Sequence, residues 1–422
     1  MSDSPSQSRD ATQLDGLQTH EIAALLEDPT ALELRDDIAD IVAELPVQAF
    51  AMMVSRLQAE NRLDLAIPHA TPEQLTGVLD LNAWRGDRLH FVESRGWLLA
   101  IAEHYGQANK TRGNLVDLIE EMDPEIWTLS LAPATAVAEL DPEDDQSRQV
   151  ASESMGSLHT FDTPDGFYVV GVPDDAFGRA AERVIKAIYD DSLEHGRKLI
   201  VSIKYALHAQ DEEQLFRFRT ARLADMGFPA WEDAMRIFTP LPRGTLDRLV
   251  EQSESPQPPT VETELPISWR DGSELLRKVM ARLEAGIHGE RSREFLLLVN
   301  ELLVAQRHEP GDLARQQAAV HQAQATLGLG LELLAGGLEE ADALPILTRV
   351  VERAGVRHLF RFAYGALAKL RKAALALHGQ GRVSMNAMGS LLDQPWGTSL
   401  RTLSAWYPQL PIGTSETKLR PI

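Results

Sequence analysis

Apolar residues recur at three- and four-residue spacing along most of the chain, which predicts amphipathic helices that bury one face. In the first part, prolines cut this pattern into short pieces such as IADIVAEL and AFAMMVSRL. Several of these prolines are followed closely by an acid, as in TPEQL and DPEIW, which suits the first turn of a helix. Short helices joined by tight turns predict a helical superhelix over residues 19–150.

One hairpin is predicted inside a middle helical region that covers residues 151–252. The segment LHTFDTPDGFYVVGV places the turn sequence TPDG between two runs of β-forming residues. We therefore expect a small β-hairpin near residues 158–172. The later segment LIVSIKY fits a helix on spacing and a strand on propensity, and the sequence leaves both open.

The segment SESPQPPTVETELP, residues 253–266, has no apolar periodicity and predicts an exposed linker or long loop. Beyond it, a C-terminal helical bundle is expected over residues 267–422. Its expected helices cover residues 273–285, 292–306, 312–334, 338–354 and 356–377, with shorter ones up to Tyr407. At the other end, the polar composition of residues 1–18 predicts a disordered arm.

Composition narrows the classes of function. The chain carries 63 acidic and 41 basic residues, and its net charge of -22 opposes binding to nucleic acid. The absence of cysteine excludes disulfides, thiolate catalysis and cysteine-ligated metals. No apolar run approaches the roughly 20 residues that a spanning helix needs, so no membrane insertion is expected. Cytoplasm is the expected location.

The segment FRFRTARLADMGFP holds three arginines that fall on different faces of a predicted helix. Arg219 and Arg222 project into its apolar arc, whereas Arg217 lies opposite and can pair with Glu213. Gly227 is expected to end the helix in the left-handed conformation. Because a buried guanidinium needs a partner, Arg219 and Arg222 are predicted to meet a carboxylate, helix carbonyls or a bound anion.

Glu301, in FLLLVNELLVA, is a candidate partner for these arginines. One interpretation pairs Glu301 with Arg219 or Arg222 across the predicted linker. The other places Asn300 and Glu301 at a partly solvated edge of their helix. The candidate binding residues are therefore Arg219, Arg222 and Glu301.

A search for catalytic and metal-binding motifs finds no nucleophile elbow, phosphate loop, dinucleotide fingerprint or paired histidines. Gly328 and Gly330 lie in a helical pattern and are expected to permit close packing or a kink. Acidic pairs such as Asp190-Asp191 could hold Mg²⁺ or Ca²⁺, although solvated acidic faces explain them as well. No catalytic residue, metal ligand or cofactor is predicted.

Two resemblances add to these observations. The segment from Asp36 to Trp84 is similar to the helical N-terminal domain of bacterial magnesium transporters, which implies an armadillo-like superhelix and a response to divalent cations. The segments FRFRTARLADMGFPAWEDAMRIF, LDLNAWRGDRL, VNELLVA and LGLGLELL together resemble an uncharacterised bacterial family known only as a domain of unknown function. This second resemblance spans most of the chain and implies no activity.

The sequence therefore predicts a mostly α-helical protein, with an armadillo-like superhelix followed by a helical bundle. A non-enzymatic role in protein–protein interaction or regulation is favoured, since superhelices offer extended surfaces. The alternatives are a sensor of divalent cations and an enzyme that uses Arg219 and Arg222 on an anionic substrate. The surroundings of the two arginines distinguish a non-enzymatic role from an enzyme. Carboxylates in the core would favour the former, and a cavity that solvent reaches would favour the latter.

Overall fold

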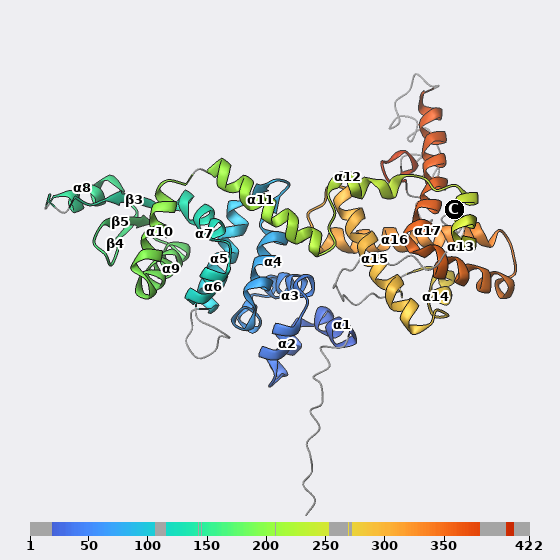
Figure 1. Cartoon of the computed structure of the whole chain (residues 1–422), viewed down its shortest axis with the longest axis horizontal. Helices are drawn as coiled ribbons and strands as arrows, with labels where there is room; N and C mark the ends of the chain where they lie inside the picture. Colours follow the sequence, from blue (N-terminus) through green and yellow to red (C-terminus); the bar gives the residue numbers. More distant parts are fainter. Residues whose placement is uncertain are drawn as a thin grey trace, which may run out of the picture. The chain divides into compact units, whose positions relative to one another are not determined.

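The computed structural model describes residues 19–105, 115–141, 143–144, 146–206, 208–252, 269, 272–379 and 402–408. These residues are mostly helical, with small antiparallel sheets, as the periodicity predicts (Figure 1). They form two compact units. The first holds residues 19–78 and 95–206, and the second holds residues 79–94 and those from 208 onward. The predicted arm and linker lie outside the described residues, and the superhelical arrangement stays a prediction.

The first unit is built from short helices and one sheet. Its elements are α1 (Thr19–Glu27), η1 (Pro29–Leu34), α2 (Ile38–Glu44), α3 (Val47–Ala59), η2 (Leu63–Leu65), η3 (Ile67–His69), the start of α4 (Pro72–Asn82), most of α5 (Phe91–Tyr105), α6 (Leu115–Glu121), α7 (Pro124–Leu131), η4 (Ala132–Ala134), β3 (Ala136–Glu139), α8 (Ser147–Ser154), β4 (His159–Asp162), β5 (Tyr168–Val172), α9 (Ala176–Asp191) and α10 (Leu193–Lys204).

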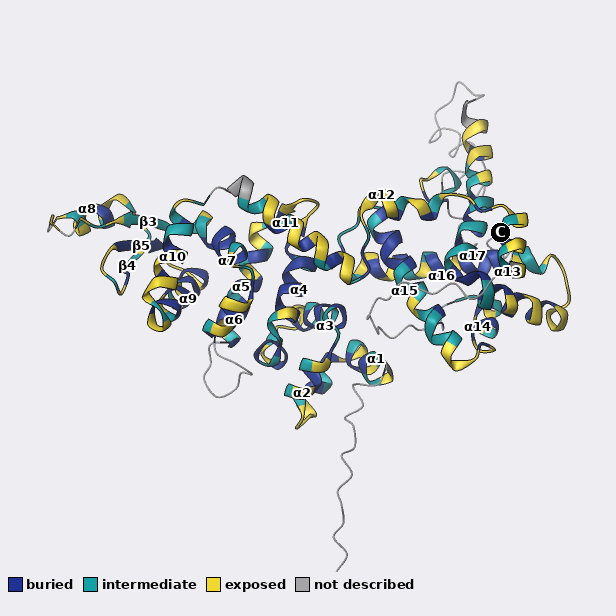
Figure 2. Ribbon diagram, viewed as in Figure 1, coloured by how far each residue is buried: buried dark blue, intermediate teal, exposed yellow. Residues whose placement is uncertain are grey.

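Prolines begin several of these helices, as their spacing predicts. Pro29, Pro72 and Pro124 each occupy the first residue of a helix, where a missing N–H costs nothing. Helix α7, which begins at Pro124, is buried from Ile126 to its end (Figure 2). The proline pattern therefore located helix starts correctly.

The predicted hairpin is confirmed, and the structure adds a third strand to it. β4 pairs antiparallel with β5, with Phe161 opposite Val170, and β3 pairs with the other edge of β5. β3 was not predicted, because its four residues, AVAE, have little β preference apart from the valine. LIVSIKY falls on α10, which settles the open choice in favour of a helix.

The turn of this hairpin is fastened by a buried carboxylate. Asp165 accepts hydrogen bonds from the Thr163 hydroxyl at 2.6 Å and the Phe167 N–H at 3.2 Å, and it pairs with Arg197 of α10 at 3.1 Å. Burial would raise the pKa of Asp165, but these donors together hold it below its usual value. The hairpin is thus tied to α10.

The second unit contains the end of α4, the start of α5 and the C-terminal helices. Its other elements are β1 (Trp84–Arg85), β2 (Arg88–Leu89), α11 (His208–Asp225), α12 (Trp231–Ala234), η5 (Met235–Phe238), α13 (Arg243–Gln252), α14 (Glu274–Met280), α15 (Ala285–Ala305), α16 (Leu313–Ala335) and α17 (Glu340–Gly379). β1 and β2 form a hairpin that the sequence analysis missed. Helices α15 and α16 carry much of the buried surface (Figure 2).

The long helix α17 is broken at Gly355, between the two helices that the sequence predicts there. Gly355 has φ 76° and ψ 170°, outside the helical region. Arg291 of α15 donates to the carbonyls of Val351 and Glu352 on one side of the break, at 2.9 and 2.8 Å. Three residues further along α15, Glu294 accepts from the N–H groups of residues 356 and 357 on the other side, at 3.0 and 3.1 Å. One ion pair therefore caps both helix ends that the break exposes.

Close packing explains the glycines of α16, as expected. A Cβ at Gly330 would lie 2.9 Å from Cδ1 of Leu359, and one at Gly328 would lie 2.7 Å from Oγ of Ser273. Neither position has room for a larger side chain without a shift of its neighbour. Within the described ranges, we find no helix with the length and apolar character that crossing a membrane requires.

Candidate functional site

The arginine helix ends as the sequence predicts. Gly227 has φ 85°, the Phe228 N–H donates to the Leu223 carbonyl at 2.8 Å, and the Gly227 N–H donates to the Ala224 carbonyl at 2.9 Å. This pair of bonds is a Schellman motif, which satisfies carbonyls at the end of α11. Pro229 follows, and α12 begins two residues later.

Arg219 is buried and contacts the end of α4 and the β1–β2 turn. Its Nε donates to the Asp80 carbonyl at 2.7 Å, and its Nη1 lies 3.4 Å from the Gly86 carbonyl. The guanidinium also lies over the Trp84 ring, 5.1 Å from its centroid. Burial lowers the pKa of Arg219, while the nearby Asp80 carboxylate acts in the opposite direction.

The expected partners of the two arginines were a carboxylate, helix carbonyls or a bound anion. Arg219 meets the backbone carbonyl of Asp80, and Arg222 meets its carboxylate. Arg222 binds it in the bidentate manner, with Nε 2.5 Å from Oδ2 and Nη2 2.9 Å from Oδ1. The Asp80 side chain is 1% exposed. Arg217 lies on the outer face and pairs with Glu213 at 2.5 Å, as expected. Arg219 and Arg222 therefore belong to a packed cluster that joins α4, β1–β2 and α11.

The predicted pairing of Glu301 with Arg219 or Arg222 is wrong. Glu301 accepts from Arg357 of α17 at 2.6 Å, because its face of α15 packs against α17. The expectation of a partly solvated edge is also wrong, since Asn300 and Glu301 are 1% and 8% exposed. Burial raises the pKa of Glu301 to about 7, although Arg357 opposes the rise.

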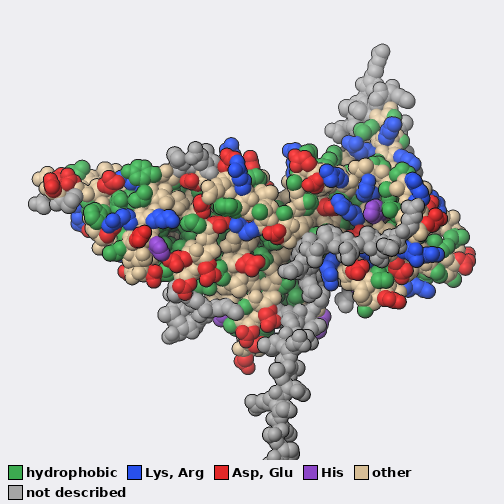
Figure 3. All heavy atoms as spheres, viewed as in Figure 1, with side chains coloured by type: hydrophobic (Ala, Val, Ile, Leu, Met, Phe, Trp, Pro, Cys, Tyr) green, Lys and Arg blue, Asp and Glu red, His purple; other side chains and the backbone are tan. Residues whose placement is uncertain are grey.

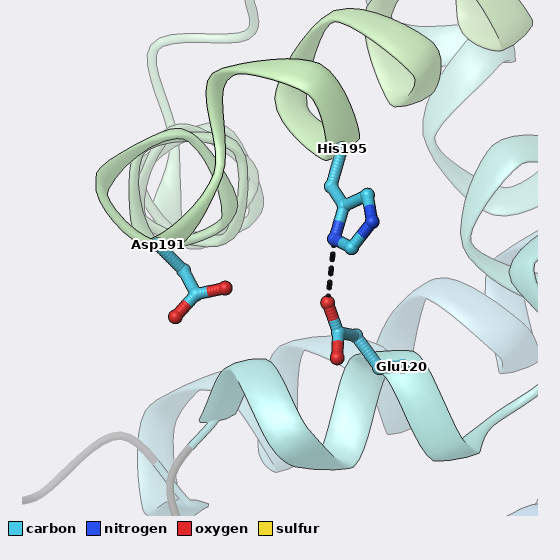
Figure 4. Close-up of side chains that lie close together, drawn as sticks. All are labelled: Glu120, Asp191 and His195. Atoms are coloured by element: carbon cyan, nitrogen blue, oxygen red, sulfur yellow. Dashed lines mark hydrogen bonds and ion pairs between the residues drawn. The ribbon is translucent and has the colours of Figure 1, made fainter.

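A different constellation, in the first unit, has the properties of a ligand site. Glu120 of α6, Asp191 at the end of α9 and His195 at the start of α10 turn their side chains toward a common space (Figure 4). The His195 Nδ1 lies 2.7 Å from the Glu120 Oε1. One ligand atom from each residue lies within 4.8 Å of those from the other two, and all three side chains are exposed.

The turn between α9 and α10 sets this geometry. Ser192 ends α9 and caps α10, with its hydroxyl accepting from the His195 N–H at 3.3 Å. Gly196 then lets α10 approach α9 closely, because a Cβ there would lie 2.4 Å from the Tyr189 ring. His195 and Asp191 are thus held four residues apart on either side of one tight turn.

A cavity of about 360 Å³ opens beside this group, between α6, α7, α9 and α10. Its lining is mainly apolar and also includes charged and hydroxyl side chains. The lining residues are Ile119, Glu120, Pro124, Trp127, Thr128, Ile188, His195, Lys198, Leu199 and Ser202. Trp127 is 1% exposed, and its indole Nε1 has no hydrogen-bond partner among the described atoms.

The sequence analysis missed this site for a physical reason. Asp191 was considered only with its neighbour Asp190, and Glu120 lies 75 residues from its partner His195. Ligand spacing within one segment cannot reveal groups that three helices bring together. The available signal was local: an acid and a histidine flank a serine cap, in DDSLEH.

Comparison with known proteins gives one match. The model of a family of unknown function, DUF6178, matches residues 25–421, in agreement with the resemblance seen in the sequence. No curated protein and no solved structure shows a significant match. The resemblance of residues 36–84 to magnesium transporters therefore finds no support.

Removing Arg222 is expected to destabilise the second unit strongly. Arg222→Ala leaves the buried Asp80 without its bidentate partner, which costs about 3 kcal/mol of unfolding free energy. Arg217→Ala, on the exposed face of the same helix, should change it by less than about 0.5 kcal/mol. Urea unfolding of the two variants measures the difference. Equal losses would contradict a structural role for the Asp80 pair.

Glu301→Gln should change the pH dependence of stability. In the wild type the folded pKa, about 7, lies above the unfolded value, so the folded state binds the proton more tightly. The contribution of Glu301 to the free energy of unfolding is therefore fully present at low pH. It is lost as pH rises from about 4.5 to 7, by on the order of 2 kcal/mol. Gln cannot titrate and so lacks this loss. The unfolding temperature of Glu301→Gln minus that of the wild type should therefore increase from pH 5 to pH 8. Exposed Glu213→Gln is the control, and parallel profiles for Glu301→Gln and the wild type would refute the effect.

Proposed function

We propose that this chain, which belongs to DUF6178, a family of unknown function, is a non-enzymatic regulatory protein that binds a small amphipathic molecule in the cavity of the first unit. The observation that carries this proposal is the cavity itself, with a mainly apolar lining that also includes charged and hydroxyl side chains. Sites of this volume and lining are typical of small-molecule binding.

The lining indicates the chemistry of the ligand. Ile119, Ile188 and Leu199 line the cavity and would cover an apolar body, with about 25 cal/mol gained for each Å² removed from water. Trp127 offers an N–H donor that has no partner among the described residues, so an acceptor on the ligand would satisfy it. Lys198 in the lining favours an anionic head group.

The proposal does not take up the enzymatic alternative through Arg219 and Arg222. Both guanidinium groups contact Asp80, one at the carbonyl and one at the carboxylate. An anionic substrate would have to displace a buried carboxylate that is already bound at two atoms. These contacts support a structural role for both arginines, and we therefore propose no ligand for them.

Anilinonaphthalene sulfonate, an aromatic anion, is a suitable probe of the cavity. It should bind the wild-type chain saturably at one strong site, with a rise in probe fluorescence. Ser202→Phe narrows the cavity and should weaken this binding at least ten-fold, and Lys198→Met should weaken it several-fold. The measurement is a fluorescence titration of each variant.

The matched control is Lys186→Met on α9, because Lys186 pairs with Glu182 and does not line the cavity. Its titration should match that of the wild type. Circular dichroism confirms that each variant is folded. Unchanged binding in folded Ser202→Phe would reject the cavity as the binding site.

Protein binding is a second candidate function, and the distribution of charge favours it. Residues 19–206 carry 34 acidic and 15 basic residues, whereas residues 267–422 carry 15 acidic and 19 basic residues. Acidic side chains gather over α6 and α9 in the view of Figure 3. This excess supports a partner with a basic surface, since complementary charge steers association.

Crosslinking in the native host, followed by mass spectrometry, tests this second function. A basic protein should be enriched at low salt and lost at about 0.5 M salt, where exposed charges are screened. The double variant Glu121→Gln and Asp190→Asn should recover less of it, since both residues are exposed acids of the first unit. Equal recovery by variant and wild type would argue against this surface.

A further inference from the structure

We propose that Glu120, Asp191 and His195 form a binding site for a divalent transition-metal ion of the zinc class. The three residues supply one imidazole and two carboxylates, from three helices, around one space (Figure 4). Catalytic and regulatory zinc sites commonly use three protein ligands of these types and leave the fourth position open. The site shares Asp191 with the acidic pair Asp190-Asp191, but its imidazole ligand distinguishes it from the magnesium or calcium site that such a pair suggests.

The ligand atoms lie near the separations that a zinc ion requires, but Nδ1 of His195 and Oε1 of Glu120, now 2.7 Å apart, would have to move slightly apart. Ligand atoms around a tetrahedral zinc ion lie about 3.4 Å apart, for bonds of about 2.0–2.1 Å. The present ligand atoms lie within 4.8 Å of one another. The side chains of His195 and Glu120 are 54% and 46% exposed. A change of side-chain torsion that moves their ligand atoms by about 1 Å therefore has room in solvent.

The hydrogen bond between His195 and Glu120 marks where the ion would bind. The His195 Nδ1–H donates to the Glu120 Oε1 at 2.7 Å. A metal ion would bind Nδ1 of the tautomer that carries its one proton on Nε2. The neutral ring would reach this tautomer by moving its proton from Nδ1 to Nε2, and an imidazolium ring would reach it by losing its Nδ1 proton to solvent. The ion would then also offset the repulsion between the Glu120 and Asp191 carboxylates.

The proposed metal site borders the cavity. Glu120 and His195 both line the cavity, as does the buried Trp127, whose indole N–H has no partner among the described atoms. An imidazole ligand favours zinc, cobalt or nickel over magnesium and calcium, which prefer oxygen donors alone. The open fourth position would face the cavity.

Isothermal titration of the untagged chain with Zn²⁺ tests the site. One equivalent should bind tightly, and a thousand-fold excess of Mg²⁺ should not displace it. His195→Ala should weaken binding at least a hundred-fold. Asp191→His, which replaces an oxygen ligand by a second imidazole, should tighten it about ten-fold. Co²⁺ should show the strong visible absorption of a tetrahedral site in the wild type and lose it in His195→Ala.

The control is His159→Ala. His159 also pairs with a glutamate, Glu182, at 3.2 Å in the same unit, but no third ligand is grouped with them in the part of the chain that the structure describes. This variant should bind Zn²⁺ like the wild type. Any of three results would overturn the proposal. Zn²⁺ binding could survive His195→Ala, His195→Ala and His159→Ala could lose equal Zn²⁺ affinity, or Mg²⁺ could displace the bound Zn²⁺. Because the metal is titrated without an organic ligand, the result is independent of the proposed function of the cavity.

Discussion

The pairing of Arg291 with Glu294 is the interaction on which the packing of the second unit most depends. Helices α13, α14, α15 and α16 all pack against α17, and α17 is broken at Gly355. A broken helix exposes carbonyls on one side and N–H groups on the other, and both sets would be costly to bury. The guanidinium and carboxylate of α15 meet one set each, at 2.8–3.1 Å. The break can therefore lie inside the core.

Much of the fold could be predicted from local pattern. Prolines marked helix starts, the sequence TPDG marked a hairpin, and the break in α17 falls between two predicted helices. The start of α15 was placed seven residues too late, at Ser292, because AGIHGER has two glycines and little apolar periodicity. Packing against neighbouring helices overrides that weak propensity. The hairpin at Trp84 was missed because each of its strands has two residues.

Charge partners were harder to predict than helices. Helical geometry correctly separated Arg217 from Arg219 and Arg222, since the angle around one helix is fixed by the sequence. It could not identify Asp80 as their partner, because that depends on which helix packs beside α11. The same limit hid the Glu120, Asp191 and His195 group, whose members come from three helices. Sequence periodicity specifies which face a side chain takes, and tertiary packing decides what that face meets.

The Asp80 cluster also has a consequence for the order in which the chain folds. Asp80 and Arg222 are 142 residues apart, and most of the first unit is encoded between them. At about 5–20 residues per second, a ribosome takes roughly seven to thirty seconds to synthesise that interval. During this time residues 79–94 have been synthesised, but α11, whose Arg222 pairs with Asp80, has not. The first unit can fold early on a growing chain, whereas the second must wait for α11 to leave the ribosome.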